Sequence, residues 1–313
     1  MTDNAPKERS EPPAGVPLFP GVFLRGMLMG AADIVPGVSG GTMAFITGIY
    51  QRLITAISSI GPRLVLQWRR EGFASVWAAV DGRFLLTLVS GIAVSVFTLA
   101  RLIALLLETQ PVLLWSFFFG LILASALVLT RHVQRWHGGT VAALLAGLAF
   151  AAMIGLSPAV SLPVAPASFF VAGFIAICAM ILPGISGSFV LVLLGLYPAV
   201  LEAIRGFDLI PLGLFAVGAA CGLLVFSRVL RWLLATYHST TLATLTGFLF
   251  GSLPVVWPWK LPTPASELLH PVWPSSYAAA GLVAPSLLWC LLLMGLGVGA
   301  VWLLESRWGG LER

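Results

Sequence analysis

Residues 36–42 read Pro-Gly-Val-Ser-Gly-Gly-Thr, a helix-breaking and hydroxyl-rich run inside apolar sequence. Proline removes a backbone donor and glycine permits unusual backbone angles, so a helix that reaches this run is expected to end there. A similar run, Pro-Gly-Ile-Ser-Gly-Ser, returns 147 positions later at residues 183–188. The same spacing aligns residues beyond the two runs, Gly48 with Gly195 and Tyr50 with Tyr197. The chain therefore contains an internal repeat, and each copy is built around a broken helix.

The composition of the 313-residue chain excludes an ordinary soluble domain. Hydrophobic residues make up 59% of it, charged residues only 9%, and the mean hydropathy is +1.00. These values are typical of an all-α polytopic membrane protein. The net charge of +5 comes from basic residues scattered between apolar segments, which does not indicate nucleic-acid binding. The three cysteines all lie in apolar segments, so we expect no disulfide framework, no metal site and no cofactor.

The apolar segments predict both spans and hairpins. Segment 22–35 makes roughly 21 Å of helix, less than the roughly 30 Å hydrocarbon core of a bilayer. Because residues 42–60 can return to the starting side, we predict a re-entrant helical hairpin with its tip at the first run, and a second one over residues 169–204. The predicted spans lie at 84–107, 112–130, 141–156, 209–230, 240–256 and 278–304.

Arginine and lysine orient these segments, since short cytoplasmic loops are enriched in both. The basic loops at 61–83, 131–139 and 231–239 are predicted to lie inside, together with both termini. The connectors at 157–167 and 257–276, which together hold only Lys260, are predicted to lie outside. The first hairpin then enters from the cytoplasm and the second from the outer face. The predicted fold is two inverted repeats, each a re-entrant helical hairpin followed by transmembrane helices, as in many secondary transporters.

The expected domain organisation follows from these assignments. Residues 1–20 form a disordered cytoplasmic tail, and residues 21–304 form a single transmembrane domain. Within that domain we expect repeat 1 at about 21–131, a linking span at 140–156, repeat 2 at about 168–256 and a final span at 278–304. A spacing of 127 aligns the spans that follow each hairpin, pairing Gly91 with Gly218, Arg101 with Arg228 and Gly120 with Gly247.

The two runs have the chemistry of an anion site. A helix that restarts after a break presents free N–H groups and the positive end of its dipole, which favour phosphate or carboxylate. The candidate phosphate-binding residues are Ser39, Gly40, Gly41 and Thr42 in the first run and Ser186, Gly187 and Ser188 in the second. The alternative is that the hydroxyl groups only cap the restarted helices.

Three charged residues inside the apolar segments are further candidates. Arg101 and Arg228 are expected to close on a phosphate at a hairpin tip, since a cation at membrane depth usually faces a cavity or a partner. Alternatively, both side chains snorkel to the lipid headgroups. Asp33 has no acidic counterpart, because the aligned residue is Met180. It is a candidate for coupling protons or another ion to transport, or else a structural acceptor for the run or for Arg25.

Four stretches carry a resemblance to a known family: MGAADIVPGVSGGT at residues 29–42, LPGISGS at 182–188, FSR at 226–228 and YH at 237–238. In these the chain resembles the bacterial polyprenyl-phosphate transporter family, and the resemblance runs from about residue 21 to 259. It implies a translocase in the bacterial cytoplasmic membrane that returns undecaprenyl phosphate, the lipid carrier of cell-wall glycans, from the outer to the inner leaflet of the lipid bilayer. The family's motif falls on Asp33 and residues 36–42. The second copy lacks the acid and the second glycine-threonine pair, so the two tips are not expected to be equivalent.

Two other functions stay open on the sequence. Polyprenyl-pyrophosphate phosphatases carry a similar Pro-Gly-x-Ser run, but theirs continues into arginine where this chain has Gly40 and Gly187, and no paired glutamates face these positions. We therefore expect a transporter and not an enzyme. Anion channels and exchangers also hold anions at opposed helix starts, so an ion pathway is the second alternative.

Overall fold

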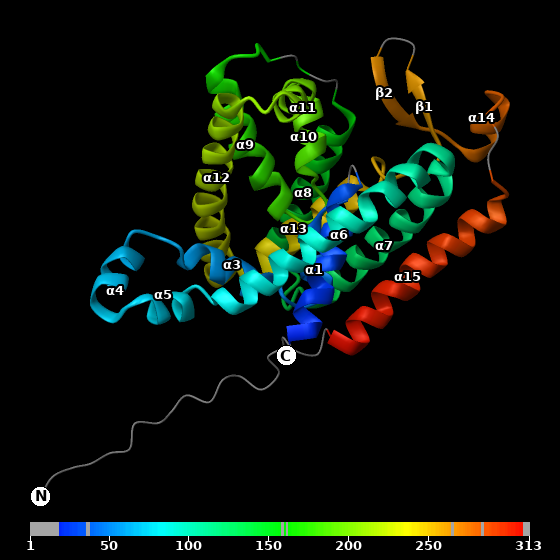
Figure 1. Ribbon diagram of the computed structural model, residues 1–313. Helices are drawn as coiled ribbons and strands as arrows, with labels where there is room; N and C mark the ends of the chain where they lie inside the picture. The colour runs from blue at the N-terminus through cyan, green and yellow to red at the C-terminus, as the bar shows by residue number, and fades with distance from the viewer. Residues whose placement is uncertain are drawn as a thin grey trace, which may run out of the picture.

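The computed structural model describes residues 19–35, 38–157, 160, 162–263, 266–282 and 285–308. Most of the expected tail and the Pro36-Gly37 pair of the first run lie outside the described residues. The described part is a bundle of helices with one small sheet at its upper end (Figure 1).

Within the described residues, five helices are long and apolar enough to cross a membrane: α6 (Gly82–Thr109), α7 (Pro111–His132), α8 (Gly138–Leu156), α12 (Leu209–Thr236) and α15 (Leu287–Trp308). A helix suits the interior of a membrane, where water is absent, because it satisfies its own backbone hydrogen bonds. These helices confirm the prediction of an all-α polytopic membrane protein. The predicted span 240–256 is shorter in the structure, where α13 (His238–Ser252) ends just before Pro254, which cannot continue a helix. The last span begins at Leu287, because α14 (Pro274–Ala279) is separate and Gly281 turns the chain with a φ of +76°.

At both runs the chain breaks and packs back on the preceding helix. The first half contains α1 (Phe19–Ile34), α2 (Gly40–Ile46) and α3 (Tyr50–Ser59), and the second contains α9 (Pro166–Ile181), α10 (Gly187–Leu193) and α11 (Tyr197–Gly206). Each return divides at a glycine, Gly48 with a φ of 66° and Gly195 with a φ of 68°, a backbone region that favours glycine. α10 and α11 meet at 110°. In Figure 1, α1 starts at the lower end of the bundle and α9 at the upper end, and their inner ends approach each other in the middle.

Matching glycines hold the long helices together in both halves. α1 packs on α6 through Gly26 and Gly91, and α9 packs on α12 through Gly173 and Gly218. A Cβ at any of these positions would overlap a backbone carbonyl oxygen of the facing helix. In the same order, these oxygens belong to Leu88, Phe23, Phe215 and Phe170. Every residue in this set is related to its counterpart by a spacing of 147 or 127, so the repeat found in the sequence is also a repeat of packing.

The correspondence reaches one helix beyond each predicted repeat. α15 packs on α7 through Gly297 and Gly120, and α8 packs on α13 through Gly147 and Gly247. The facing carbonyl oxygens belong to Phe117, Met294, Thr244 and Leu144. The last helix of the first half, α8, therefore packs on the second half, and the last helix of the second half, α15, packs on the first. The orientation of the halves relative to a membrane stays a prediction.

Two connectors contain structure that the sequence analysis did not anticipate. The arginine-rich loop holds two short helices, α4 (Arg63–Glu71) and α5 (Phe73–Ala79). The tryptophan-rich connector forms an antiparallel hairpin of β1 (Lys260–Thr263) and β2 (Ser266–Pro271). The hairpin is fastened by Trp257, whose indole N–H donates to the carbonyl oxygen of Val272 at 2.8 Å.

Lys260 on β1 is a half-buried amine outside the predicted spans. Its Nζ donates to the carbonyl oxygen of Val255 at 2.8 Å and lies 3.6 Å from the centre of the Trp115 ring. Burial nevertheless lowers the pKa of Lys260 from 10.5 to about 7.

Stability should therefore depend on pH through Lys260. Between pH 7 and 10.5 the unfolded chain binds this proton and the folded chain does not, so the free energy of unfolding rises with pH, by at most about 1.4 kcal/mol per unit. We expect the melting temperature of the detergent-solubilised protein to rise from pH 6.5 to 9, and to rise less in Lys260→Met. Equal pH dependence in the two proteins would contradict the assignment.

Candidate functional site

The two broken helices meet where α9 ends, and Ser39 makes the first contact. Its hydroxyl lies 2.9 Å from the carbonyl oxygen of Met180 and 3.1 Å from that of Leu182, and it donates to these oxygens. Carbonyl groups at the end of a helix lack partners in a following turn. The Ser39 oxygen also accepts the N–H of Gly41 at 3.1 Å, which caps α2. Ser39 therefore caps its own helix and fastens the first half to the second.

Thr42 and Tyr50 extend this contact. Thr42 Oγ1 accepts the backbone N–H of Gly184 at 3.0 Å, and the Tyr50 hydroxyl donates to the carbonyl oxygen of Ile181 at 3.2 Å. We name the contact of Ser39, Thr42 and Tyr50 with the end of α9 the tip junction. These three side chains are at most 1% exposed. In this structure the hydroxyl groups of the first run thus bond to protein atoms: that of Ser39 caps α2 and also contacts the second half, and that of Thr42 contacts the second half.

The second run makes no matching contact among the described residues. Ser186 caps α10 through a long bond of 3.5 Å from the N–H of Phe189, and its oxygen lies 2.9 Å from that of Ser188. Tyr197, which aligns with Tyr50, is 40% exposed. The two tips are therefore not equivalent in this structure, because the Ser186 and Ser188 hydroxyl groups bond to each other instead of to the opposite half.

A pocket of about 210 Å³ lies beside the second run, between α9, α10 and α12. Its polar lining consists of Asp33, Ser186 and Ser188. Its other lining residues are small or apolar: Gly173, Ala176, Ile177, Met180, Gly187, Leu191, Phe215 and Ala219. The pocket thus offers two serine hydroxyl groups and one carboxylate in apolar walls.

Asp33 reaches this pocket from the first half, and Gly40 holds it there. Asp33 Oδ1 accepts the backbone N–H of Gly40 at 2.7 Å. A Cβ at position 40 would lie 2.5 Å from Asp33 Oδ2, so only glycine lets the carboxylate approach this closely. Gly41 and Gly187 have similar roles, since a Cβ there would lie 2.5 Å from the carbonyl oxygen of Ile181 and 2.6 Å from that of Ala176.

The structure does not bring Arg101 or Arg228 to the pocket, since neither is among its lining residues. Arg101 is exposed on the outer surface of α6. Arg228 donates to the carbonyl oxygen of Leu224 at 3.1 Å and also to that of Ile60, which ties α12 to the end of α3. Spacing along the sequence aligned these arginines, but the rotation of each helix decides where its side chain lies.

Arg25 is a buried cation whose role the sequence analysis left open. Its side chain is 1% exposed, and Nε donates to the carbonyl oxygen of Thr47 at 3.0 Å. This bond fastens α1 to the turn that follows α2. The sequence already indicated a structural or functional role for Arg25, because Arg25 and Asp33 are the charged residues of the apolar segment 22–35.

The class of the protein follows from its apolar helices, from the two helix breaks that meet among them, and from the mainly apolar pocket beside the second break. The protein is a polytopic α-helical membrane protein whose two broken helices meet beside a pocket, an arrangement typical of secondary transporters.

Comparison with known proteins gives the family. The sequence model of the undecaprenyl phosphate translocase-like family matches residues 29–267. A polyprenyl-phosphate transporter of Vibrio cholerae is 49% identical over 238 residues, which cover 76% of this chain and 77% of that protein. A polyprenyl-phosphate transporter of Staphylococcus aureus is 32% identical over 263 residues, covering 77% and 87%. No solved structure matches the chain. The chain belongs to the undecaprenyl phosphate translocase-like family.

Proposed function

We propose that the protein is a translocase that returns undecaprenyl phosphate from the outer to the inner leaflet of the bacterial cytoplasmic membrane, for reuse in the synthesis of cell-envelope glycans. The observation that carries this proposal is the pocket where Asp33 of one half meets Ser186 and Ser188 of the other. A volume of about 210 Å³ has room for a phosphate headgroup but not for a long prenyl chain. The headgroup binds in the pocket, and the prenyl chain stays in the lipid.

The pocket is proposed to hold the headgroup in the outward-facing state. The positive-inside rule places the start of α9 at the outer face, and the pocket lies against α9 and the first half of α12. Ser186 and Ser188 donate to phosphate oxygens, with Gly187 between them allowing close approach. Arg101 and Arg228 lie on the two spans that follow the hairpins, where we propose that they meet the headgroup as it enters and leaves.

The tip junction is proposed to open when the headgroup moves inward. In the structure, Ser39 and Thr42 bind the backbone at residues 180–184. Because the two runs are related by the repeat, the opposite state would free Ser39 and Thr42 for phosphate, with Gly40 and Gly41 beside them. Both halves then contribute to the path, one in each state, as expected for alternating access.

Asp33 is proposed to carry the coupling proton. A carboxylate and a phosphate in one apolar pocket repel each other, so the headgroup binds best when Asp33 is protonated. The substitution Asp33→Asn would keep a side-chain oxygen that accepts the N–H of Gly40 and would remove the charge. We expect Asp33→Asn to flatten the dependence of transport on pH, measured in proteoliposomes.

The control for this prediction is a carboxylate remote from the pocket. Asp81 forms an ion pair with Arg52, so Asp81→Asn should keep the wild-type dependence of transport on pH. An unchanged profile in Asp33→Asn would remove the coupling role.

The function is tested by leaflet-resolved movement of undecaprenyl phosphate in liposomes that contain only this protein. The pyrophosphate lipid is a parallel substrate, and released phosphate is assayed in the same samples. Movement without hydrolysis supports the translocase. Hydrolysis would indicate a phosphatase, and ion flux without lipid movement would indicate a channel or exchanger; either result overturns the proposal.

A further inference from the structure

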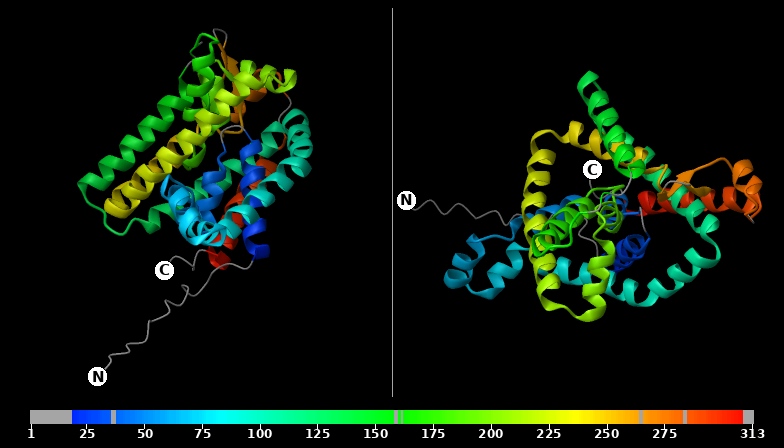
Figure 2. Two further views of the ribbon diagram at one scale, coloured as in Figure 1. Left: turned by 60° about the vertical axis from the view of Figure 1, so that its left-hand side comes forward. Right: turned by 90° about the horizontal axis from the view of Figure 1, so that it is seen from above.

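The connector between α3 and α6 is a helical unit that lies outside the bundle. α4 and α5 project sideways at the end where α1 begins and α15 ends (Figure 1), and they stand apart from the bundle when it is viewed from above (Figure 2). Neither helix has a buried residue. Large apolar side chains are nevertheless present, with Val65, Leu66, Trp68 and Phe73 between 54% and 65% exposed.

Specific contacts give this unit a defined shape. The side-chain amide of Gln67 on α4 donates to the Ser75 hydroxyl on α5 at 2.6 Å, and Ser75 donates to Glu71 at 2.5 Å. The rings of Phe73 and Trp77 lie 5.8 Å apart. The exposed apolar side chains therefore belong to an ordered surface.

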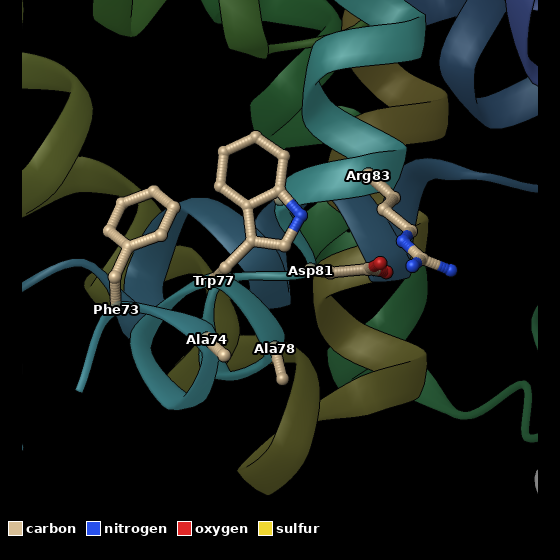
Figure 3. Close-up of a pocket in the computed structure, with 7 residues that line it drawn as sticks. Phe73, Ala74, Trp77, Ala78, Asp81 and Arg83 are labelled. Atoms are coloured by element: carbon tan, nitrogen blue, oxygen red, sulfur yellow. The ribbon is translucent and has the colours of Figure 1, made fainter. Parts of the chain in front are cut away.

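The base of the unit is fixed to the bundle. Arg52 on α3 forms an ion pair with Asp81 at 2.6 Å, and its guanidinium lies 4.3 Å from the centre of the Phe84 ring. An open pocket of about 670 Å³ lies at this base; Figure 3 shows the Phe73 and Trp77 rings on one side and Arg83 on the other. The unit is held by α3 at the start of α6, which is one of the candidate membrane spans.

The unit carries exposed positive charge. Arg63, Arg69 and Arg70 on the unit and Arg83 at the start of α6 are exposed, and none has an ion-pair partner among the described residues. Of the two acids of the unit, Asp81 pairs with Arg52, whereas Glu71 accepts hydrogen bonds from Gln67 and Ser75 and keeps its negative charge. Free arginines beside exposed aromatic and aliphatic side chains are the composition of helices that lie in a membrane interface.

We propose that α4 and α5 form a docking element for the anionic lipid surface of the cytoplasmic leaflet. Val65, Leu66, Trp68 and Phe73 insert at the boundary of headgroups and acyl chains, and the arginines bind lipid phosphates. A second copy of the chain fits this surface poorly, because it would bring two sets of unpaired arginines together. The element anchors α3 and α6, and through them the first hairpin, to one leaflet.

Quenching of Trp68 by brominated lipid tests the element in the full-length protein. The protein is reconstituted into brominated phosphatidylcholine alone or mixed with phosphatidylglycerol, without polyprenyl phosphate, and the Trp68 signal is the difference between wild type and Trp68→Phe. We expect quenching of this signal to increase with phosphatidylglycerol and to fall at high salt. Each arginine near an anionic surface should raise the ratio of membrane-bound to unbound α4–α5 element about five-fold.

Matched variants separate charge recognition from simple burial in lipid. The triple variant Arg63→Gln, Arg69→Gln, Arg70→Gln should lose the effect of phosphatidylglycerol and keep its fold, because these side chains are exposed. Trp302 on α15, 68% exposed on a membrane span, should be quenched equally in both lipids. A Trp68 signal that is unquenched in both lipids, or quenched equally in both, overturns the proposal. So does concentration-dependent crosslinking of two copies through α4 and α5.

Discussion

Replacing Gly218 by alanine is expected to separate α9 from α12 and to destabilise the second half of the bundle. The new methyl group would overlap the carbonyl oxygen of Phe170, which is backbone and cannot rotate away. Overpacking of this kind costs about 1–3 kcal/mol. The melting temperature of the detergent-solubilised protein should therefore fall by several degrees, since this contact joins two of the most extensively packed helices.

Gly213 on the same helix provides the matched control. A Cβ at position 213 meets nothing within 4 Å, so Gly213→Ala should change stability little. Gly91→Ala is the counterpart of Gly218→Ala at the spacing of 127. It should destabilise the first half by a similar amount, because its Cβ would overlap the backbone carbonyl oxygen of Phe23. If Gly218→Ala and Gly213→Ala melt at the same temperature, the close packing of α9 on α12 is contradicted.

The second large effect is expected on transport, from Ser186→Ala and Ser188→Ala together. Hydrogen bonds to a charged group contribute about 1.5–3 kcal/mol each, so each lost hydroxyl should weaken binding of the phosphate headgroup by about ten-fold or more. The fold should survive, since Ser186 caps α10 only through a 3.5 Å bond and the Ser188 hydroxyl contacts that of Ser186 at 2.9 Å. Binding and flipping of undecaprenyl phosphate in proteoliposomes measure the loss.

The control for the double variant is another buried serine. Ser125 is 2% exposed and bonds within its own helix, to the carbonyl oxygen of Leu121 at 2.5 Å. Ser125→Ala should transport normally. Normal transport in the double variant would remove both serines from the site, and loss of transport together with unfolding would show that their role is structural.

The hairpins illustrate which features were predictable. Proline and glycine act on the backbone locally, so the breaks at residues 36–42 and 183–188 could be located from residue types alone, and the spacing of 147 showed that they correspond. The division of each return at Gly48 and Gly195 was also present in the sequence, as an aligned glycine pair. It was not recognised, because a conformation with positive φ is only one of several reasons for a glycine.

The candidate site residues show what could not be predicted from the sequence. Ser39 and Ser186 align in the sequence, yet Ser39 bonds to the end of α9 whereas Ser186 faces the pocket. Arg101 and Arg228 also align, yet one is exposed on α6 and the other bonds to Ile60. No local property distinguishes the members of these pairs, because the difference depends on which groups the other half presents.

The sequence by itself determined the class of protein, the two breaks, five of the spans and the repeat. Hydropathy and backbone chemistry decide these features, and both act within a few residues of each position. The tertiary structure alone decided the tip junction, the pocket shared by Asp33, Ser186 and Ser188, and the crossed packing of α8 and α15 on opposite halves. These features depend on helix rotation and on contacts between residues far apart in the chain, which are set by close packing of the whole bundle.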